Sequence, residues 1–550
     1  MKLKIVWLLS CLTWVAACGG SDDETPTVST DPDASDDTET DTGEPADAVY
    51  SVTVDGDVVY PVRVAKFDVP VNYVHMSYTG SEMSFEVTPK TSFSDFTLSP
   101  KSKGIEATAS GDTISFKISE PVYLILQIPD HERLLILVDP TEEDAPSLDD
   151  ANVKNIMDYE GIDNTGETDL VDVIQQAIDE ASGAARNILY FPKGTYASSM
   201  LYLRDDMTLY LAEGAVLKNV TPQSKLMSHP SDLTVIEVCS RGFIVMNGIS
   251  NAKLKGRGTI DGNGAELQSF NRKMFLVKIE NSSNCEIEGI ISRDSCFWNT
   301  VIYRSDNISI ENYKVINNRL DGDWNETDGV DFNNCTNSTL SNAFLYTGDD
   351  CMAVKADDIP DGLEVSGIAD PTVSDNYINV DNILHEHVVC FSASSGCKVG
   401  TKTFGETMSN ITFRDIDVVT GLRGLAIDAV DTANIIGTRF EDIRIEAVGG
   451  DLVDFNMDSG AISWRTNLGT CTVTDTSVID VAAEALSTCV IEGNVHDYST
   501  PEKDPYFGNE YFVDGVSFQN FSIAGNVIQS LDDPNAAFSV NDYATNITFE

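Results

Sequence analysis

Residues 284–287 read Asn-Cys-Glu-Ile, and residues 307–310 repeat the pattern as Asn-Ile-Ser-Ile, 23 positions later (284 to 307). Similar short runs that start with asparagine follow at residues 410–413, 434–436 and 546–549. A period in the low twenties, with short strands and polar corners, is typical of a β-solenoid, whose coils stack inward-facing residues on one another. The repeat therefore predicts a parallel β-helix.

A single helix is expected before the first coils. Apolar residues recur there at helical spacing, with Asp169 in the first turn and Gly183 just past the end: Leu170, Val173, Ile174, Ala177 and Ile178. We expect this helix to cap the open end of the stack and to protect its edge.

Residues 48–140 predict a separate, small β-sandwich. One stretch alternates apolar and polar residues as a half-buried strand does, with the apolar positions at Met83, Phe85 and Val87. Two apolar runs, 122–128 and 134–138, flank a Pro-Asp-His-Glu turn and predict a hairpin. Residues 141–151 are polar and are expected to link the sandwich to the β-helix domain, residues 152–550.

The chain begins with a targeting segment. Lys2 and Lys4 precede an apolar run too short to span a bilayer, and Cys18 follows it within Val-Ala-Ala-Cys-Gly-Gly. We expect residues 1–18 to form a lipoprotein signal with Cys18 lipidated, and residues 19–47 to form an acidic, disordered linker. The protein is then an outer-membrane lipoprotein of the bacterial cell envelope, or a secreted protein if an ordinary signal peptide is cut nearby.

The charge balance excludes several kinds of partner. Lys and Arg number 35 against 88 Asp and Glu, which gives a formal net charge of −53. Nucleic acid binding needs a basic footprint, and an anionic membrane surface repels a chain of this charge. We expect no nucleic-acid partner, and we expect a monomer.

The cysteines leave two alternatives open. The chain has 11, of which nine lie at or after Cys239, and none shows the Cys-x-x-Cys spacing of a zinc site. Export permits disulfides, whereas a solenoid core also accommodates buried thiols.

The candidate for chemistry is a group of three aspartates. Asp328 lies in Glu-Thr-Asp-Gly, and Asp349 and Asp350 follow in Gly-Asp-Asp, with 21 positions from the first to the second (328 to 349). Neighbouring coils stack about 4.8 Å apart, so a spacing of one coil places the three carboxylates side by side. Their repulsion should raise at least one pKa, which is the condition for a general acid beside a general base. Glycoside hydrolysis needs such a pair.

Two further motifs carry a resemblance. Residues 191–196 read Phe-Pro-Lys-Gly-Thr-Tyr, and residues 256–262 read Gly-Arg-Gly-Thr-Ile-Asp-Gly. Over roughly residues 152–550 the chain is similar to the polygalacturonase-like glycoside hydrolases, and its N-terminal β domain resembles that of the dextranase and isopullulanase family. The resemblance implies an all-β protein, a right-handed parallel β-helix preceded by a small β-sandwich.

The resemblance also implies roles for the three aspartates. Asp349 corresponds to the general acid, and Asp328 with Asp350 to the pair that holds the attacking water. The family inverts the anomeric centre, and we expect no cofactor. Glu326 stands where the family motif has asparagine, a departure close to Asp328.

The residues that would meet the substrate depart further from the family. Residues 395–401 match the family's Gly-His-Gly region without a histidine, and His385 and His387 are expected at the surface. Polygalacturonases use Arg-Ile-Lys to bind the galacturonate carboxylate, and this chain has Ala426 and Asp428 at those two charged positions. An aspartate there repels a uronate, which favours a neutral or sulfated sugar backbone.

Several residues near the motifs are candidates for a sugar cleft, because sugars stack on aromatic rings and charged side chains lie near the aspartates in the sequence. For the aromatic residues the alternative is packing in the core. The candidates are Trp298, Tyr303, Trp324, Glu326, Lys355, Lys402 and Arg423. Asp321, Asp323 and Asn325 mimic the start of an EF-hand loop, but Glu326 and Phe332 stand where that loop needs Gly and Glu. We therefore predict no metal site and leave open only a weak, irregular cation site.

These observations predict a lipid-anchored, inverting glycoside hydrolase whose partner is an extracellular polysaccharide, either a dextran-like α-glucan or a galactan. The alternative is a polygalacturonase-type pectin hydrolase, which would need Arg423 to do the work of an Arg and a Lys. A polysaccharide lyase is disfavoured because the sequence shows no cluster of cations near the aspartates. A non-catalytic carbohydrate-binding solenoid is the third class.

Overall fold

The computed structural model describes residues 45–64, 70–222, 241–268, 273–317, 326–356, 379–457, 471–495, 508 and 510–550. All of them lie in one compact unit, Glu39–Glu550. The predicted signal segment and Cys18, and most of the predicted linker, lie outside these residues. Across the described part of the chain, no helix is long and apolar enough to cross a membrane.

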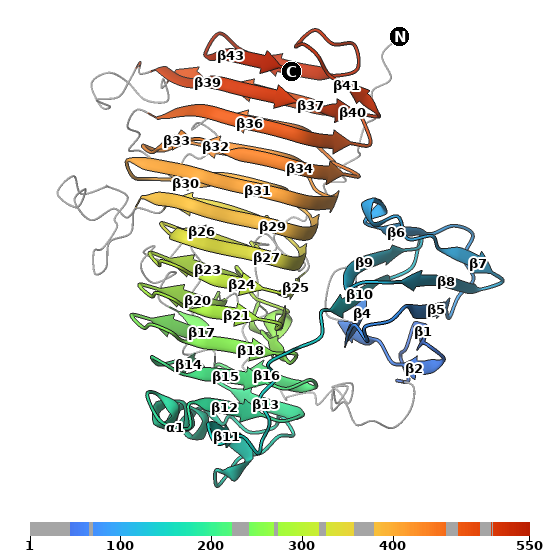
Figure 1. Ribbon diagram of the computed structural model, residues 1–550, viewed down its shortest axis with the longest axis vertical. Coiled ribbons are helices and arrows are strands. Elements are labelled where there is room, and N and C mark those ends of the chain that lie inside the picture. The colour runs from blue at the N-terminus through green and yellow to red at the C-terminus, as the bar shows by residue number, and fades with distance from the viewer. Residues whose placement is uncertain are drawn as a thin grey trace, which may run out of the picture. The chain divides into compact units, whose positions relative to one another are not determined.

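Two five-stranded sheets pack face to face in the first part of the chain (Figure 1). Alternation along β5 turns Met83, Phe85 and Val87 inward, as predicted, and the β9–β10 pair is the predicted antiparallel hairpin. The strands are ordered β2-β1-β5-β8-β7 and β3-β4-β10-β9-β6. Their bounds are β1 (Tyr50–Val54), β2 (Asp57–Val59), β3 (Val62–Val64), β4 (Val71–Ser77), β5 (Met83–Pro89), β6 (Thr97–Ser99), β7 (Thr108–Ser110), β8 (Thr113–Ile118), β9 (Val122–Gln127) and β10 (Arg133–Asp139).

The rest of the described chain winds into a parallel β-helix, seen in Figure 1 as a ladder of stacked strands. Each strand pairs in parallel with the strand one coil later, as β21 does with β24, and Ile287 lies beside Ile310 in that pairing. Parallel crossovers of this kind are right-handed. The predicted right-handed parallel β-helix is therefore confirmed. The predicted period in the low twenties holds only for some coils: Ile287 and Ile310 are 23 positions apart (287 to 310), whereas Leu340 and its partner His385 are 45 apart (340 to 385), because loops of different length join the strands.

The repeated asparagine has a structural reason. Asn284 and Asn307 have φ values of 54° and 55°, in the left-handed region that asparagine tolerates better than most residues. The side-chain amide of Asn307 donates a 2.7 Å hydrogen bond to the side-chain oxygen of Asn284. Asparagine therefore turns this corner and also joins it to the next coil, whereas some other corners have Asp or Gly in the same conformation, such as Asp442 and Gly437.

The strands fall into two arrays, which are parallel except that β38 and β41 pair in antiparallel fashion with β39 and β40. One holds β11 (Val153–Asn155), β12 (Ile188–Phe191), β13 (Gly194–Ser198), β15 (Thr208–Leu211), β16 (Ala215–Asn219), β18 (Lys253–Gly256), β19 (Thr259–Asp261), β21 (Glu286–Glu288), β22 (Ile291–Arg293), β24 (Ser309–Glu311), β25 (Lys314–Ile316), β27 (Thr336–Thr347), β29 (Val380–Ser392), β31 (Thr407–Thr420), β33 (Asn434–Ile436), β34 (Arg439–Ile445), β36 (Thr472–Ala483), β38 (Asn494–Val495), β39 (Glu510–Gln519), β40 (Ser522–Ile523), β41 (Asn526–Val527) and β43 (Ala544–Phe549). The other, which carries the candidate site, holds β14 (Leu201–Tyr202), β17 (Gly242–Asn247), β20 (Phe275–Glu280), β23 (Thr300–Tyr303), β26 (Val330–Asn333), β28 (Met352–Ala356), β30 (Ser395–Thr403), β32 (Arg423–Ala429), β35 (Asp451–Asn456), β37 (Thr488–Glu492) and β42 (Ala537–Val540).

The predicted helix is α1 (Val171–Ala181), and a second, short helix is α3 (Gly264–Gln268). Ile174, Ala177 and Ile178 of α1 are fully buried in the core of the β-helix, and α1 lies at its first coils (Figure 1). The helix thus covers the end of the stack, as the sequence predicted.

The sandwich and the β-helix share a buried surface. Tyr73 and Leu137 of the sandwich belong to the same apolar cluster as Ile316 and Phe344 of the β-helix. Beside this cluster Asp139 forms a fully buried ion pair with Lys314. Asp139 also accepts hydrogen bonds of 2.7 Å from His75 Nε2 and from the Tyr123 hydroxyl.

The structure shows where His385 and His387 lie and which of the described cysteines form a disulfide. The expectation of a surface His385 is wrong: its ring is fully buried and stacks on Phe413, with 4.9 Å between ring centres, because the aromatic face suits the stacked interior. The side chain of His387 is half exposed, as expected. Cys351 and Cys390 form a disulfide, and six other described cysteines are buried thiols.

Candidate active site

The candidate site lies on the outer surface of four neighbouring strands, β26, β28, β30 and β32. Side chains alternate along a strand, so residues next to the stacked core positions point away from the interior. The core positions, matched in register, are Phe332, Val354, Val399 and Ile427. Their outward neighbours are Asp331, Lys355, Lys398 and Asp428.

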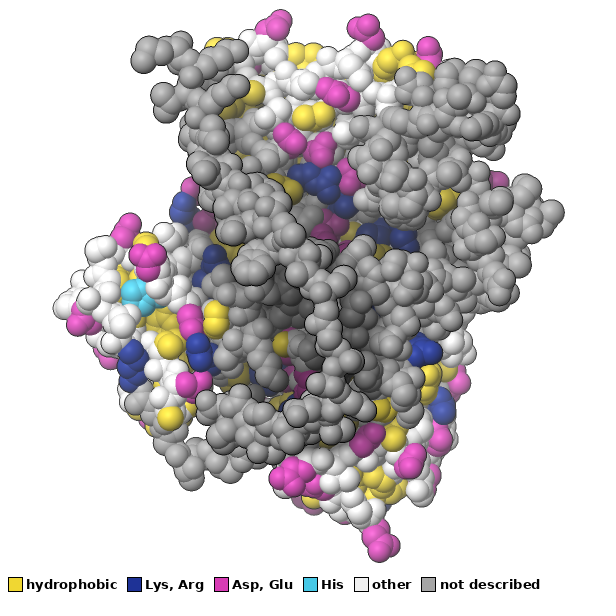
Figure 2. Space-filling model, turned by 180° about the vertical axis from the view of Figure 1, so that it is seen from behind, with side chains coloured by type: hydrophobic (Ala, Val, Ile, Leu, Met, Phe, Trp, Pro, Cys, Tyr) yellow, Lys and Arg dark blue, Asp and Glu magenta, His cyan; other side chains and the backbone are white. Residues whose placement is uncertain are grey.

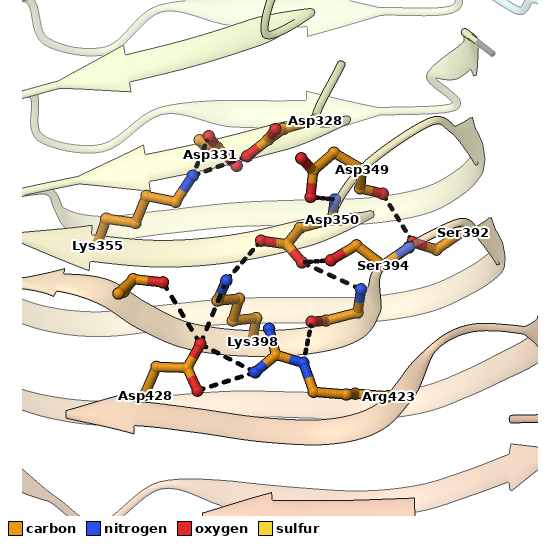
Figure 3. A network of polar contacts seen from close by, with 12 residues as sticks. Asp328, Asp331, Asp349, Asp350, Lys355, Ser392, Ser394, Lys398, Arg423 and Asp428 are labelled. Carbon is orange, nitrogen blue, oxygen red and sulfur yellow. Dashed lines mark hydrogen bonds and ion pairs between the residues drawn. The ribbon is translucent and has the colours of Figure 1, made fainter. Parts of the chain in front are cut away.

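The three candidate catalytic aspartates lie at the start of two of these strands. Asp328 comes just before β26, and Asp349 with Asp350 comes just before β28. The backbone N–H of Gly329 donates a 2.9 Å hydrogen bond to the carbonyl oxygen of Asp350, which fixes the two turns against each other. Figure 3 shows the three carboxyl groups near one another, with Asp328 in one set of contacts around Lys355 and with Asp349 and Asp350 in a second set that includes Lys398.

Asp328 shares one lysine with a second carboxylate. Lys355 Nζ lies 2.8 Å from Asp328 Oδ2 and 2.7 Å from Asp331 Oδ2, and all three side chains are buried. Burial raises the pKa of Asp328, while the charge of Lys355 acts in the opposite direction. Burial raises the pKa of Asp331 well above its usual range. One ammonium group thus serves two carboxylates, and of the two the pKa of Asp331 is raised further.

Asp350 is the most strongly held carboxylate of the site. Its Oδ2 lies 2.8 Å from Lys398 Nζ, and its Oδ1 accepts hydrogen bonds from the Ser394 hydroxyl at 2.8 Å and from the Ser395 N–H at 3.0 Å. Burial alone would raise the pKa of Asp350, but the charges of Lys398, Lys355 and Arg423 outweigh it and lower this pKa. Of the three aspartates, Asp350 is therefore the one whose ionised form is most strongly favoured.

Asp349 has a different environment. Its carboxylate accepts a 2.9 Å hydrogen bond from the Asp350 N–H, and in the described part of the chain it makes no ion pair with Lys or Arg. Its backbone carbonyl accepts hydrogen bonds from the Thr347 and Ser392 hydroxyls at 2.6 and 2.7 Å. Burial and the charges of Asp328 and Asp350 raise the pKa of Asp349 well above its usual range. A carboxyl group that stays protonated next to two anions can act as a general acid.

Arg423 is held by carboxylates of its own and of the next strand. Its Nη1 lies 2.9 Å from Asp428 Oδ1 and 3.0 Å from Asp454 Oδ2, and its Nε donates a 3.0 Å hydrogen bond to the Ser395 hydroxyl. Lys398 Nζ lies 3.3 Å from Asp428 Oδ2. The expectation that Asp428 acts as an uncompensated negative charge is therefore wrong, because two cations neutralise it.

The other predicted binding residues are only partly brought together. Lys355 and Lys402 lie 3.8 and 5.3 Å from the centre of the Trp298 ring, and Tyr303 packs in the same buried aromatic cluster. Glu326 lies 2.8 Å from Lys273 Nζ, and its charge contributes to the raised pKa of Asp328. Trp324, and the weak cation site predicted at Asp321, Asp323 and Asn325, fall outside the described residues.

Lys398 and Asp331 belong to the site but were not predicted. Both lie on strands whose inward residues can be recognised from alternation. A charged residue at an outward position of such a strand was therefore the sequence signal that could have identified them as site residues. Lys398 in particular lies between the inward Cys397 and Val399. The expectation that no cluster of cations stands near the aspartates is wrong, since Lys355, Lys398 and Arg423 all contribute to the network in Figure 3. Basic and acidic side chains also lie next to one another on the face drawn in Figure 2.

Part of the chain matches a known family of proteins. Residues 231–497 match the family model "Glycosyl hydrolases family 28". A probable polygalacturonase from Vitis vinifera is 26% identical over 238 residues, 40% of this chain and 46% of the plant protein. The chain thus spans about half the length of the curated relatives it matches.

Two solved structures show the same fold at low sequence identity. A family 28 exopolygalacturonase from Yersinia enterocolitica aligns with a TM-score of 0.54 at 14% identity, over 88% of this chain and 98% of that one. Dex49A from Penicillium minioluteum aligns with a TM-score of 0.57 at 12% identity, over 91% of this chain and 94% of that one.

Proposed function

Because residues 231–497 form a glycosyl hydrolases family 28 domain, we propose that this protein is an inverting glycoside hydrolase of the polygalacturonase type. One observation carries the proposal: three adjacent carboxyl groups have unequal environments. Asp328 and Asp350 each have a lysine partner, whereas Asp349 has neighbouring anions and a raised pKa. This is the division into acid and bases that hydrolysis of a glycosidic bond requires.

In the proposed reaction Asp349 donates its proton to the glycosidic oxygen as the bond from that oxygen to the anomeric carbon breaks. A water molecule held by Asp328 and Asp350 attacks the anomeric carbon from the opposite face and transfers a proton to one of these carboxylates. That proton later returns to Asp349 through solvent. The attack from the opposite face inverts the anomeric centre.

The substrate class we propose is a pectin-type polysaccharide that contains galacturonate. The comparisons favour this alternative over the neutral or sulfated glycan that was the first expectation, since the relatives found are named polygalacturonases and xylogalacturonan hydrolases. The first expectation rested on an uncompensated Asp428, and two cations neutralise that residue. Lys355, Lys398 and Arg423 supply the positive charge of this face.

Release of reducing ends by the full chain tests the proposal on polygalacturonate, xylogalacturonan, dextran and pullulan. We expect release from a galacturonate polymer. The anomeric configuration of the first product should be opposite to that of the bond cleaved. Asp349→Asn should lose at least 90% of this activity, because general acid catalysis contributes about 10²–10⁴-fold. Asp112→Asn, on the exposed surface of the sandwich, is the matched control and should keep full activity.

Two outcomes would contradict the proposal. Release from dextran or pullulan alone would restore the first expectation about the substrate. Residual activity of Asp349→Asn above about a tenth of the wild type would refute the acid role of Asp349.

We also propose that the protein is exported and anchored by a lipid on Cys18, which is supported by Lys2, Lys4 and the apolar run before Cys18. A labelled fatty acid fed to the producing bacterium should enter the protein, and Cys18→Ala should abolish the label. Equal labelling of both proteins would exclude the anchor.

A further inference from the structure

We propose that Lys355 and Lys398 are positioning residues that hold Asp328 and Asp350 as anions, so that the proton of the three-carboxylate group resides on Asp349. The inference rests on the proposed hydrolase function and extends it to two residues that need not touch the substrate. It assigns Lys355 to Asp328 and Lys398 to Asp350, the two carboxylates proposed to hold the attacking water.

The two lysines are placed in the same way. Lys355 lies between Asp328 at 2.8 Å and Asp331 at 2.7 Å. One coil further, Lys398 lies between Asp350 at 2.8 Å and Asp428 at 3.3 Å. Each lysine thus joins one water-holding carboxylate to a second carboxylate (Figure 3).

These contacts are made in a buried environment. The side chains of Lys355 and Lys398 are 5% and 9% exposed, and those of Asp328 and Asp350 are each 4% exposed. A buried carboxylate without a partner takes up a proton instead of keeping its charge. Lys355 and Lys398 therefore favour the ionised forms of Asp328 and Asp350, which leaves Asp350 with a lowered pKa and Asp328 with a pKa raised less than that of Asp349.

The remaining charges leave this assignment intact. Carboxylates outnumber cations among the described groups that face the three aspartates, which favours a proton on one of the three. Asp349 has no cation within ion-pair distance among the described residues, whereas Asp328 and Asp350 do. The charged groups around the three aspartates come from several neighbouring strands. They are Glu326, Asp328 and Asp331 before and on β26, Lys355 on β28, Lys398 and Lys402 on β30, Arg423 and Asp428 on β32, and Asp454 on β35.

The pH dependence of kcat on polygalacturonate tests this role with Lys398→Met. Removal of the Lys398 charge raises the pKa of Asp350, which has to be ionised, so the acidic limb should move to higher pH by about one to three units. The basic limb should move in the same direction, because Lys398 also lowers the pKa of Asp349. Lys398→Arg keeps the charge and should restore the wild-type profile.

Lys278→Met is the matched control. Lys278 lies on the same outward row of this sheet, is also buried, and forms an ion pair with Glu280, far along the stack from Asp350. Glu280 keeps a second partner, Arg304 Nη2 at 2.6 Å, when Lys278 is replaced. This variant should leave both limbs of the profile in place.

Infrared absorption of protonated carboxyl groups gives a second readout that needs no activity. At about pH 6 the wild type should show a protonated carboxyl that Asp349→Asn lacks and Asp350→Asn retains. Lys398→Met should gain a further protonated carboxyl at about pH 5, since Asp350 is then no longer paired. Should Lys398→Met fail to fold, the same comparison is made with Lys355→Met, for which Asp328 is the group expected to gain the proton.

The outcomes separate the two proposals. A wild type that cleaves no glycan refutes the proposed function, while the infrared bands still decide where the proton lies. An active wild type with Lys398→Met indistinguishable from Lys278→Met, in both pH profile and infrared bands, overturns the role of the lysines. If the protonated-carboxyl band of the wild type is lost in Asp350→Asn and not in Asp349→Asn, the proton resides on Asp350. That result would also overturn the proposed role of the lysines.

Discussion

The ammonium nitrogen of Lys355 lies 3.8 Å from the centre of the Trp298 ring. Trp298 was a candidate platform for a sugar, but its ring is 8% exposed and faces Lys355 and Lys402. A cation over an aromatic face is stabilised by about 0.5–2 kcal/mol, more when both are desolvated. Trp298 therefore supports the lysine that bridges Asp328 and Asp331.

Trp298→Leu should lower kcat about tenfold, because loss of roughly 1.4 kcal/mol of cation–π stabilisation frees Lys355 from its place against Asp328. KM should change less, since the ring is covered by lysine. Steady-state kinetics on the substrate identified above checks this. Phe297→Leu, in the same aromatic cluster and under Lys273, is the control; equal effects of both replacements would assign Trp298 to packing alone.

Asp139→Asn should destabilise the protein by about 3–5 kcal/mol, since it leaves the fully buried Lys314 without its anion. Burial opposes the ionised form, but the charge of Lys314 and the hydrogen bond from His75 lower the pKa of Asp139. A lowered pKa stabilises the fold above the unfolded-state pKa of about 4, and this contribution is lost as pH falls further.

Urea unfolding of Asp139→Asn and wild type should therefore differ most at neutral pH and less below about pH 4. Asp112→Asn, on the exposed surface, should unfold like the wild type at both pH values. A difference between Asp139→Asn and wild type that grows on acidification would contradict the assigned charge state.

His385→Phe should stabilise the protein by about 1–3 kcal/mol near pH 5, because neither ring nitrogen has a hydrogen-bond partner in the described structure. Burial lowers the pKa of His385 to about 3. The unfolded chain therefore binds a proton that the folded protein excludes, and stability is lost as pH falls from about 6.5 toward this value.

Thermal melting of His385→Phe should accordingly show a weaker loss of stability between about pH 6.5 and 4 than the wild type shows. His387→Phe, whose ring is exposed and paired with Asp415, should bring no such gain. Parallel melting curves of His385→Phe and wild type across this range would mean that the buried ring is not the origin of the effect.

Removal of the Cys351–Cys390 disulfide should destabilise the protein by about 2–4 kcal/mol, because the bond closes a loop with a sequence separation of 39. Cys351 directly follows Asp350, and Ser392 near Cys390 donates to the Asp349 carbonyl, so kcat should fall as well. Chemical denaturation with and without reductant checks this in the wild type and in Cys351→Ala/Cys390→Ala. Only the wild type should respond to the reductant, and a response of both would point to another bond.

The adjacency of the three aspartates was predictable because only one short coil separates them. The 21 positions from Asp328 to Asp349 match the coil that the asparagine runs define, and the turns do meet. Lys398 was not predictable in the same way. It lies beside Ala353, which is 45 positions earlier (353 to 398), so counting by the period does not bring it next to the site.

The buried histidine and the charge of Asp428 were misjudged for a related reason. His385 occupies an aromatic position in the interior stack, and sequence polarity alone points to the surface. Asp428 looked repulsive because Lys398, which neutralises it together with Arg423, lies on a neighbouring strand, 30 positions earlier in the sequence (398 to 428).

By itself the sequence determined that the chain forms coils, since alternation along a strand and asparagine at several corners are local properties. It also determined the meeting of Asp328 with Asp349 and Asp350. Only the tertiary structure decided which carboxylate has a cation and which has none. That distribution depends on the register of strands that are separated by coils of unequal length. It also depends on burial, because in a buried site a 2.8 Å contact with a lysine favours the ionised form of a carboxyl group.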